Sequence, residues 1–230
     1  MSHLAHRSPG YELLSGHGIE IGALHQPAVI PAHCHIEYCD AASREETASF
    51  FPELDVNDLV SVNHISDLDT NGLALFEDNR FDFVILNHVI EHVANPINVV
   101  AELFRVTKPQ GLVVLSAPDK EFCFDKPRAL TPYEHVLEEY QNKVTEITDE
   151  HYIDFLKGVH PEVFQRSEEA IKNSIANVKK RREHAHVWDS ASFTEFMEKT
   201  FGVLNIQTQC RFLSLADQNQ FEYFSVWEKQ

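Results

Sequence analysis

The stretch "FDFVILNHVIEHVANPINVVAELFRVTKPQGLVVLSAPD", residues 81–119, decides the fold class. Residues 81–87 are apolar on both faces, which is typical of a strand buried between two layers of helices. Asn95 can cap a helix, because proline follows it at the first helical position. The pattern predicts a strand, a helix over 96–107 that "KPQG" ends, and a second buried strand over 112–116.

The same alternation of strands and helices precedes this stretch. We expect short strands over residues 19–21, 35–39 and 59–65. A helix is expected over residues 43–51, where Pro52 stops it. Strands that alternate with helices, some of them apolar on both faces, indicate a parallel sheet in an α/β fold.

The C-terminal part of the chain resumes this pattern. Asp189 can cap a helix over residues 190–201, with Gly202 just past its end. Residues 203–209 and 221–229 read as two strands joined by about eleven residues without a clear helix. Because such a link is short for a parallel crossover, we expect an antiparallel pair at one edge of the sheet.

A long helical segment, residues 119–187, separates the two parts and is called the insertion below. "TPYE" at 131–134 fits a capping box, and residues 151–158 and 161–183 read as two further helices. The last helix ends in the basic run 179–182, which we interpret as a solvated helix end. Because ligands of α/β sheets bind beyond the carboxyl ends of the strands, we expect the insertion to form a lid over the site.

Length and composition agree with one α/β domain over residues 1–230. We expect a Rossmann-like, mostly parallel seven-stranded sheet with an antiparallel last strand and the insertion after the fifth strand. The net charge of −17 argues against a nucleic-acid partner. No run of 18 apolar residues exists, so no membrane span is expected. The first residues lack the apolar core of a signal peptide, and the expected location is the cytoplasm.

The cysteines are scattered and form no CxxC pair, so we expect reduced thiols. They are Cys34, Cys39, Cys123 and Cys210. The triplet "HCH" at residues 33–35 places two histidines on one face of a strand. A structural zinc site needs about four ligands, and no second cluster with suitable spacing follows, so no metal is expected.

The loop "GIEIGALHQP", residues 18–27, keeps one glycine of a dinucleotide-binding fingerprint. Pro27 and Pro31 interrupt the twelve residues between Gly22 and His35, so the first crossover helix is predicted to be missing. A pyrophosphate relies on that helix's N-terminal amides, which counts against a nicotinamide oxidoreductase. A cofactor without phosphate, such as S-adenosylmethionine, would not need them.

Polar residues follow three of the expected strands, which places them at one edge of a parallel sheet. Asp40 can accept both hydroxyls of a ribose, although a turn or helix-cap role is equally compatible with its position. Asp67 can accept from an adenine amino group or serve as an ordinary loop acid. Asn87 and His88 come directly after the fourth strand and are placed at the cleft. Their order along the sheet favours a nucleoside-containing cofactor.

The stretch 81–119 resembles the fourth-to-fifth-strand region of class I S-adenosylmethionine-dependent methyltransferases, through "EHVANP" and "LFRVTKPQG". "GIEIGALHQP", "FDKPRALTPYEHVLEEY" and "HAHVWDSASFTEF" are similar to bacterial methyltransferase-domain proteins linked to surface-polysaccharide biosynthesis. The resemblance covers nearly the whole chain. It implies that Glu20 and Gly22 mark the first cofactor motif, and that Ala23 and Leu24 line the cofactor.

The resemblance also implies a role for each polar strand-end residue. Asp40 would hold the ribose and Asp67 the adenine, while Asn87 and His88 would lie beside the methionine and the methyl group. The implied function is S-adenosylmethionine-dependent methyl transfer to a small-molecule or glycan acceptor, with O-methylation favoured. The alternative is a catalytically silent cofactor-binding partner protein of the same fold.

Methyl transfer from a sulfonium is an in-line displacement, in which the enzyme aligns the reactants and excludes water. A hydroxyl acceptor needs a general base near the methyl group, whereas a neutral amine does not. His186, Asp119 and His88 are the candidate bases, and a hydrogen-bonded structural role is the alternative for each. Trp188 and Tyr133 can stack on a sugar ring or pack in the core, and packing is favoured.

Overall fold

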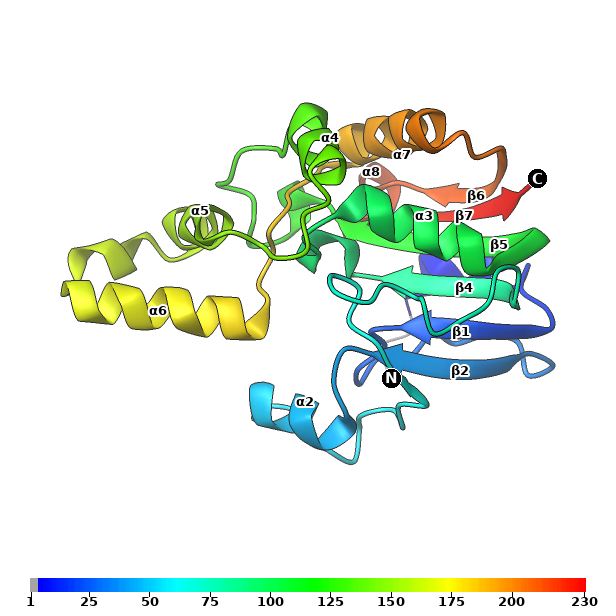
Figure 1. The fold of residues 1–230 in the computed structure, drawn as a ribbon, viewed down its shortest axis with the longest axis horizontal. Helices are drawn as coiled ribbons and strands as arrows, with labels where there is room; N and C mark the ends of the chain where they lie inside the picture. The colour runs from blue at the N-terminus through cyan, green and yellow to red at the C-terminus, as the bar shows by residue number, and fades with distance from the viewer. Residues whose placement is uncertain (1–3) are drawn as a thin grey trace.

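A seven-stranded mixed sheet forms the centre of the molecule in the computed structural model, which describes residues 4–230 (Figure 1). The strands lie in the order β3-β2-β1-β4-β5-β7-β6, and β1 to β5 are parallel. β7 is antiparallel to both of its neighbours, which confirms the predicted fold class. The strands are β1 (His17–Ile21), β2 (His35–Asp40), β3 (His64–Ile65), β4 (Phe81–Asn87), β5 (Thr107–Pro118), β6 (Thr208–Ser214) and β7 (Glu222–Lys229).

Helices cover the two faces of the sheet unequally. The α-helices are α1 (Ser8–Tyr11), α2 (Arg44–Phe50), α3 (Pro96–Val106), α4 (Tyr133–Gln141), α5 (Asp149–Val159), α6 (Glu168–Arg181), α7 (Ser190–Leu204) and α8 (Ala216–Asn219). The short 3-10 helices are η1 (Ala5–Arg7), η2 (Ile90–His92), η3 (Lys120–Phe122) and η4 (Pro161–Gln165). The larger core cluster joins one face to α3 and α7, while the smaller one joins the other face to α1 and coil.

Strand β4 shows why residues 83–86 are apolar throughout. Val84 and Leu86 belong to the core beneath α3, whereas Phe83 and Ile85 belong to the core on the opposite face. All four side chains are fully buried. Alternate residues of a strand point to opposite faces, so a strand covered on both faces must be apolar at each position.

The connection between β1 and β2 has no crossover helix, as its two prolines predict. Residues 22–34, all of which the structure describes, form turns and coil. Ala28, Ile30 and Cys34 from this connection pack against the smaller core cluster, where a helix would otherwise lie. The face of the sheet around β1 is therefore covered by irregular chain.

The strand expected over residues 59–65 was predicted too long, since β3 comprises only His64 and Ile65. The amide of Val60 donates to the carbonyl of Leu24, which binds this segment to the loop after β1. The Asn63 side chain accepts from the amide of Tyr38 and takes the place of a backbone partner. A side chain that bonds the backbone of a neighbouring strand competes with the sheet ladder.

The tail also differs from its prediction. Helix α7 continues through Gly202 to Leu204 and ends where Asn205 adopts a left-handed conformation, with φ of 52°. The amide of Ile206 donates to the carbonyl of Phe201, which closes the last turn. Residues 203–207 were therefore wrongly expected to be strand, and β6 begins at Thr208. Asn205 replaces the glycine as the residue that ends the helix.

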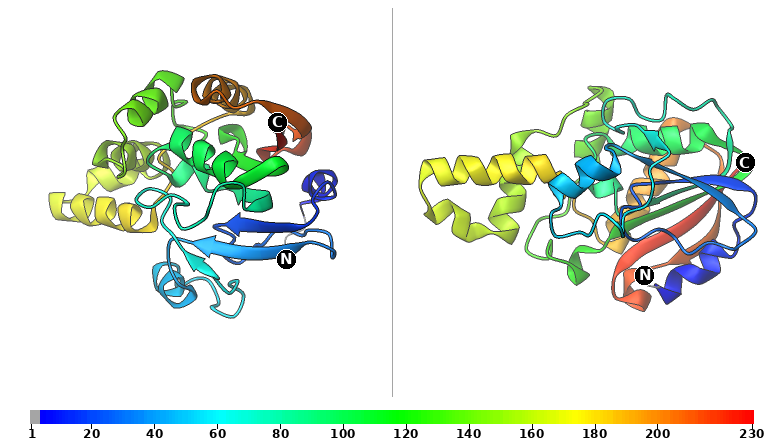
Figure 2. Two further views of the ribbon diagram at one scale, coloured as in Figure 1. Left: turned by 45° about the vertical axis from the view of Figure 1, so that its right-hand side comes forward. Right: turned by 90° about the horizontal axis from the view of Figure 1, so that it is seen from below.

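The insertion is helical, as predicted, and stands beyond the carboxyl ends of the parallel strands (Figures 1 and 2). The capping box expected at residues 131–134 is absent, since no side chain caps α4. Thr131 instead pairs with Val187: its amide donates to the Val187 carbonyl and its hydroxyl accepts from the Val187 amide. The two ends of the insertion are thereby joined.

Two further features concern membrane-spanning helices and the state of the cysteines. Among residues 4–230, no helix is both long and apolar enough to cross a membrane. The four cysteines are free thiols, and Cys39 is buried in the main core.

Candidate functional site

A cavity of about 500 Å³ lies at the carboxyl ends of β1, β2 and β4. One side, called the strand wall below, includes Gly22, Asp40, Asp67 and His88. The opposite side, called the insertion wall, consists of Lys180, Arg181 and Arg182 at the end of α6. Thr47, Phe50 and Phe51 at α2 line the cavity between them. The volume falls in the ~300–1,000 Å³ range of small-molecule and cofactor sites.

Gly22 ends β1 at the cavity with φ of 72°, a region that side chains other than glycine disfavour. A Cβ atom at this position would lie 2.5 Å from the Val89 side chain. The amide of Gly22 donates to the carbonyl of Cys39, so the turn is joined to β2. The single glycine of the loop is therefore required by the tight approach of two cavity-lining segments.

Glu20 and Ala23 lie behind the cavity and do not line it, whereas Leu24 does. Glu20 is 1% exposed, and both carboxylate oxygens accept from the amide of Ala28 at 3.0 and 3.1 Å. Burial raises the pKa of Glu20 to about 7, although the Ala28 amide and the charge of Arg7 oppose the rise. Glu20 thus holds the coil after the glycine in place.

Asp40 ends β2 and faces the cavity. One of its oxygens accepts from the amide of Ala41 at 2.7 Å, and burial raises the pKa of its carboxyl group. Lone pairs on the carboxylate remain available to a ligand, since a carboxylate can accept about four hydrogen bonds. Asp40 therefore presents free acceptor positions at the cavity.

Asp67 also faces the cavity, where the basic end of α6 meets it. Arg182 donates to both oxygens of Asp67, with Nη1 at 3.0 Å from Oδ1. Arg182 is the left-handed residue that ends α6, with φ of 49°. The interpretation of residues 179–182 as a solvated helix end is therefore wrong for Arg182. A bidentate pair to a residue 115 positions away leaves no pattern in the sequence.

His88 follows β4, lines the cavity and has a left-handed backbone, with φ of 52°. Its Nε2 lies 2.6 Å from the Oε2 atom of Glu222, and its ring stacks on Phe221. Glu222 is fully buried on β7 and also accepts from Arg7 at 2.6 and 2.5 Å. Burial alone would raise the pKa of Glu222, but His88 and Arg7 lower it to about 2. A fixed carboxylate therefore orients this imidazole.

Three other predicted residues do not line the cavity. Asn87 bonds Tyr11 and Ser116 on the side of the sheet that carries α1. Asp119 is buried, caps η3 and accepts from both the amide and the hydroxyl of Ser190. His186 is 1% exposed and lies within the insertion. Of the three candidate bases, the structure brings only His88 to the cavity.

Further polar side chains lie beside His88, and of these only His184 left no signal in the sequence. Glu91 is fully buried, and neither of its carboxylate oxygens has a hydrogen-bond partner. Nitrogens of His88, His92 and His184 surround it at 3.7–3.8 Å. The "EH" pair at 91–92 carried the sequence resemblance, whereas His184 comes from the far end of the insertion. A polar cluster around the buried Glu91 therefore adjoins the cavity next to His88 and His92.

Comparison with known proteins gives the class of this fold. A family model described as a methyltransferase domain matches residues 14–202. The chain belongs to this family, and its strand order and cavity place it among the class I S-adenosylmethionine-dependent methyltransferases.

Relatives with curated names match a short part of the chain. Proteins named uncharacterised methyltransferases, from Mycobacterium tuberculosis (strain H37Rv) and Mycobacterium leprae (strain TN), are each 49% identical over 47 residues. The match covers 20% of this chain and 18% of each relative. The aligned stretch thus spans less than a fifth of their length.

Solved structures share the fold over almost the whole chain. A methyltransferase from Aquifex aeolicus has a TM-score of 0.50 at 10% identity, covering 99% of this chain and 89% of that one. A candidate methyltransferase from Methanococcus maripaludis has the same score at 12% identity, covering 99% and 84%. A candidate zinc-dependent alcohol dehydrogenase from Rhodobacter sphaeroides scores 0.51 at 10% identity, covering 94% and 84%. Such likeness shows the fold alone.

The residues of the cavity fit S-adenosylmethionine, the cofactor of this family. The coil between β1 and β2 offers no helix N-terminus for a pyrophosphate, and this cofactor has none. The tight turn at Gly22 brings backbone to the cavity, and Asp40 presents a carboxylate there.

Proposed function

We propose that this protein transfers a methyl group from S-adenosylmethionine to a hydroxyl group of a small-molecule or glycan acceptor. The observation that carries the proposal is His88, an imidazole at the cavity whose Nε2 is held by the buried carboxylate of Glu222. A non-glycine residue in the left-handed region is an energetic cost that often marks a functional site. A base at this point suits a hydroxyl acceptor.

On the strand wall, Asp40 would accept the ribose hydroxyls and Asp67 the adenine amino group. Asp67 can serve both the adenine and Arg182, because a carboxylate has more lone pairs than one guanidinium uses. Gly22 and Leu24 would face the methionine part. Glu20 and Ala23 would support this loop from behind, and Asn87, the last residue of β4, would fix the strand end before His88 through its bond to Tyr11.

When bound, S-adenosylmethionine supplies an electrophilic methyl group on a sulfonium centre. His88 would remove the acceptor's proton. If Nε2–H donates to Glu222, then Nδ1 is the basic atom, and it lies 3.8 Å from Glu91 Oε1.

The insertion would act as a lid that excludes water from the cavity. Its basic end already contributes one wall, through Lys180, Arg181 and Arg182. The glycan class of acceptor rests on the resemblance of "TPYEHVLEEY" and "HAHVWD" to polysaccharide-linked methyltransferase-domain proteins. His184 and His92, which surround Glu91, offer hydrogen-bonding groups for a hydroxylated acceptor beside His88.

Calorimetry with S-adenosylmethionine, S-adenosylhomocysteine and NAD tests the cofactor, and binding of the two sulfur compounds alone is expected. Labelled S-adenosylmethionine with a panel of nucleotide sugars then tests the reaction. His88→Gln should lower turnover by roughly 10²–10⁴-fold while the affinity for S-adenosylhomocysteine changes little. Cofactor binding without label transfer to any acceptor would favour a catalytically silent partner. An unchanged methyl-transfer rate in His88→Gln would show that His88 is not the general base.

A further inference from the structure

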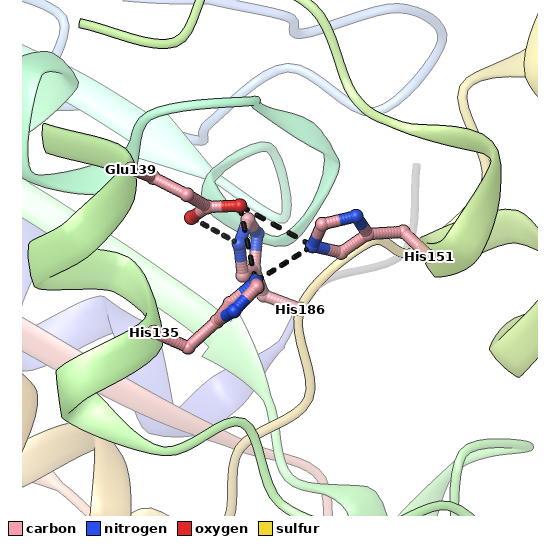
Figure 3. A group of neighbouring side chains, drawn as sticks. All are labelled: His135, Glu139, His151 and His186. Carbon is pink, nitrogen blue, oxygen red and sulfur yellow. Dashed lines mark hydrogen bonds and ion pairs between the residues drawn. The ribbon is translucent and has the colours of Figure 1, made fainter. Parts of the chain in front are cut away.

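Three histidines and one glutamate converge inside the insertion, away from the cavity (Figure 3). The insertion cluster consists of His135 and Glu139 on α4, His151 on α5 and His186 on the segment before α7. One ligand-type atom from each residue lies within 4.8 Å of the others. His135 and Glu139 are four residues apart, which puts both on one face of α4.

All three imidazoles direct the same ring atom, Nε2, into the cluster. His135 and His151 place Nε2 at 3.1 and 3.2 Å from Glu139 Oε1, and 2.9 Å from each other. His186 places Nε2 at 3.0 Å from the other oxygen of Glu139. Atoms about 3 Å apart can all lie ~2.0–2.2 Å from one ion, which is the bond length of zinc to nitrogen and carboxylate ligands.

Hydrogen bonds cannot satisfy the triangle formed by His135 Nε2, His151 Nε2 and Glu139 Oε1. An imidazole nitrogen carries one proton in the ring plane or one lone pair. If both nitrogens donate to the carboxylate, two protons face the short nitrogen–nitrogen contact. If one nitrogen donates to the other, it no longer donates to Oε1. A cation at the centre would satisfy all three atoms as lone-pair donors.

The surroundings hold these side chains in position. The His151 ring is bonded through Nδ1 to the Thr148 hydroxyl at 3.2 Å, an outer contact of the type that orients metal-binding histidines. His186 stacks on Trp188.

We propose that the insertion cluster binds one zinc ion. Three imidazole nitrogens and one carboxylate oxygen complete a tetrahedral set, and four protein ligands are typical of structural rather than catalytic zinc. The ion would cross-link α4, α5 and the segment before α7, whose ligand residues lie between positions 135 and 186 of the chain.

The ion would also position one side of the cavity. The amides of Ala185 and His186 both donate to the carbonyl of Glu91, so the two residues anchor this segment beside the polar cluster around Glu91. Arg182 and His184 precede it and reach Asp67 and Glu91. Zinc bound at His186 would therefore reduce the mobility of the insertion wall.

Metal content is measured on the full chain without an affinity tag, after dialysis against zinc chloride and then against metal-free buffer. We expect one equivalent of zinc per chain. Cobalt bound instead should give the visible absorption of a tetrahedral complex. Zinc at 100 times its dissociation constant should raise the unfolding temperature by roughly 5–10 °C.

His151→Gln and the half-exposed His135→Gln should each lose the equivalent of zinc and the cobalt spectrum. His160→Gln is the matched control, because His160 lies in the same insertion and outside the cluster. His35→Gln and His92→Gln test the two smaller groups of possible ligands. Wild-type protein without bound zinc overturns the proposal, and so does zinc that is retained in His151→Gln but lost in His35→Gln or His92→Gln. None of these results depends on catalytic activity.

Discussion

The strand wall and the insertion wall of the cavity are held in different ways. Residues of the strand wall end β1, β2 and β4, whose backbones are bonded in parallel register. The insertion wall is a helix end. Ion pairs join it to neighbouring residues, from Arg182 to Asp67 and from Arg181 to Glu53, and His92 Nδ1 contacts the carbonyl of Arg182. Both arginines are partly exposed.

Because of this difference, we assign ligand binding to the strand wall and ligand access to the insertion wall. A wall built on sheet hydrogen bonds presents ligand-binding groups in fixed positions. A wall held by partly exposed ion pairs, each worth ~0–1 kcal/mol, can open at little cost. We therefore expect substitutions on or behind the strand wall to have large effects, and substitutions on the insertion wall to have small ones.

Glu222→Ala should have the largest effect, because Glu222 supports the strand wall through His88 and Arg7. Its removal leaves the mostly buried charge of Arg7 without its partner. The free energy of unfolding should fall by about 3–5 kcal/mol. Denaturant unfolding measures the loss. Glu228→Ala, on the same strand in a more exposed pair with Arg211, should cost less than about 1 kcal/mol. Equal losses would contradict the support that we assign to Glu222.

Glu20, behind the strand wall, should make stability depend on pH. Its folded pKa of about 7 exceeds the ordinary value of 4.5, so the folded chain binds the proton more tightly than the unfolded chain. The stabilisation from this tighter proton binding is complete below pH 4.5. It is lost as pH rises through 7, which lowers the free energy of unfolding by about 3 kcal/mol. Glu20→Gln should remove the loss and be the more stable protein at pH 8, measured without cofactor. The exposed Glu45→Gln serves as control, and parallel pH profiles for wild type and Glu20→Gln would refute the prediction.

Asp40→Ala tests the strand wall directly. Hydrogen bonds from ribose to a charged acceptor contribute about 1.5–3 kcal/mol, so affinity for S-adenosylhomocysteine should fall roughly 10–100-fold. Calorimetry measures the change, with the exposed Asp58→Ala as a matched control. An unchanged affinity would mean that the ribose lies elsewhere.

Arg182→Ala should have the smallest effect on cofactor affinity, no more than a few-fold, because the pair with Asp67 is partly exposed. The insertion wall should instead become more mobile, which is seen as faster hydrogen exchange near residues 178–184. High salt should produce the same change in wild type. Arg166→Ala, also exposed on the insertion, should leave exchange there unaltered. A loss of affinity as large as in Asp40→Ala would erase the distinction between the two walls.

Much of the fold follows from local patterns. The prediction for β4 was confirmed to the residue, and α3 begins at Pro96 beneath the Asn95 cap as expected. The failures lie where a distant partner decided the outcome. The Asn63 side chain took the place of a backbone hydrogen-bond partner of Tyr38. The Thr131 hydroxyl accepts from the amide of Val187 and does not cap α4. Edge strands and helix starts are weakly specified locally, so such contacts override their propensity.

The residues of the candidate site were likewise predicted where local patterns decide their position, and missed where a distant partner decides it. Asp40, Asp67 and His88 were placed correctly at the cavity because strand ends of a parallel sheet meet at one edge. Glu222 and Arg7 were missed, since they are 215 residues apart and neither stands in a motif. His186 was expected near the methyl group, but the fold places it in the insertion cluster.

The sequence by itself determined the alternation of strands and helices, the missing first crossover helix and the polar strand ends, because periodicity, proline and strand order act locally. The tertiary structure alone decided which side chains meet across long separations. Arg182 on Asp67, Glu222 on His88 and the insertion cluster are examples. Their geometry depends on how the insertion and the two ends of the chain pack on the sheet, and such packing leaves no periodic pattern in the sequence.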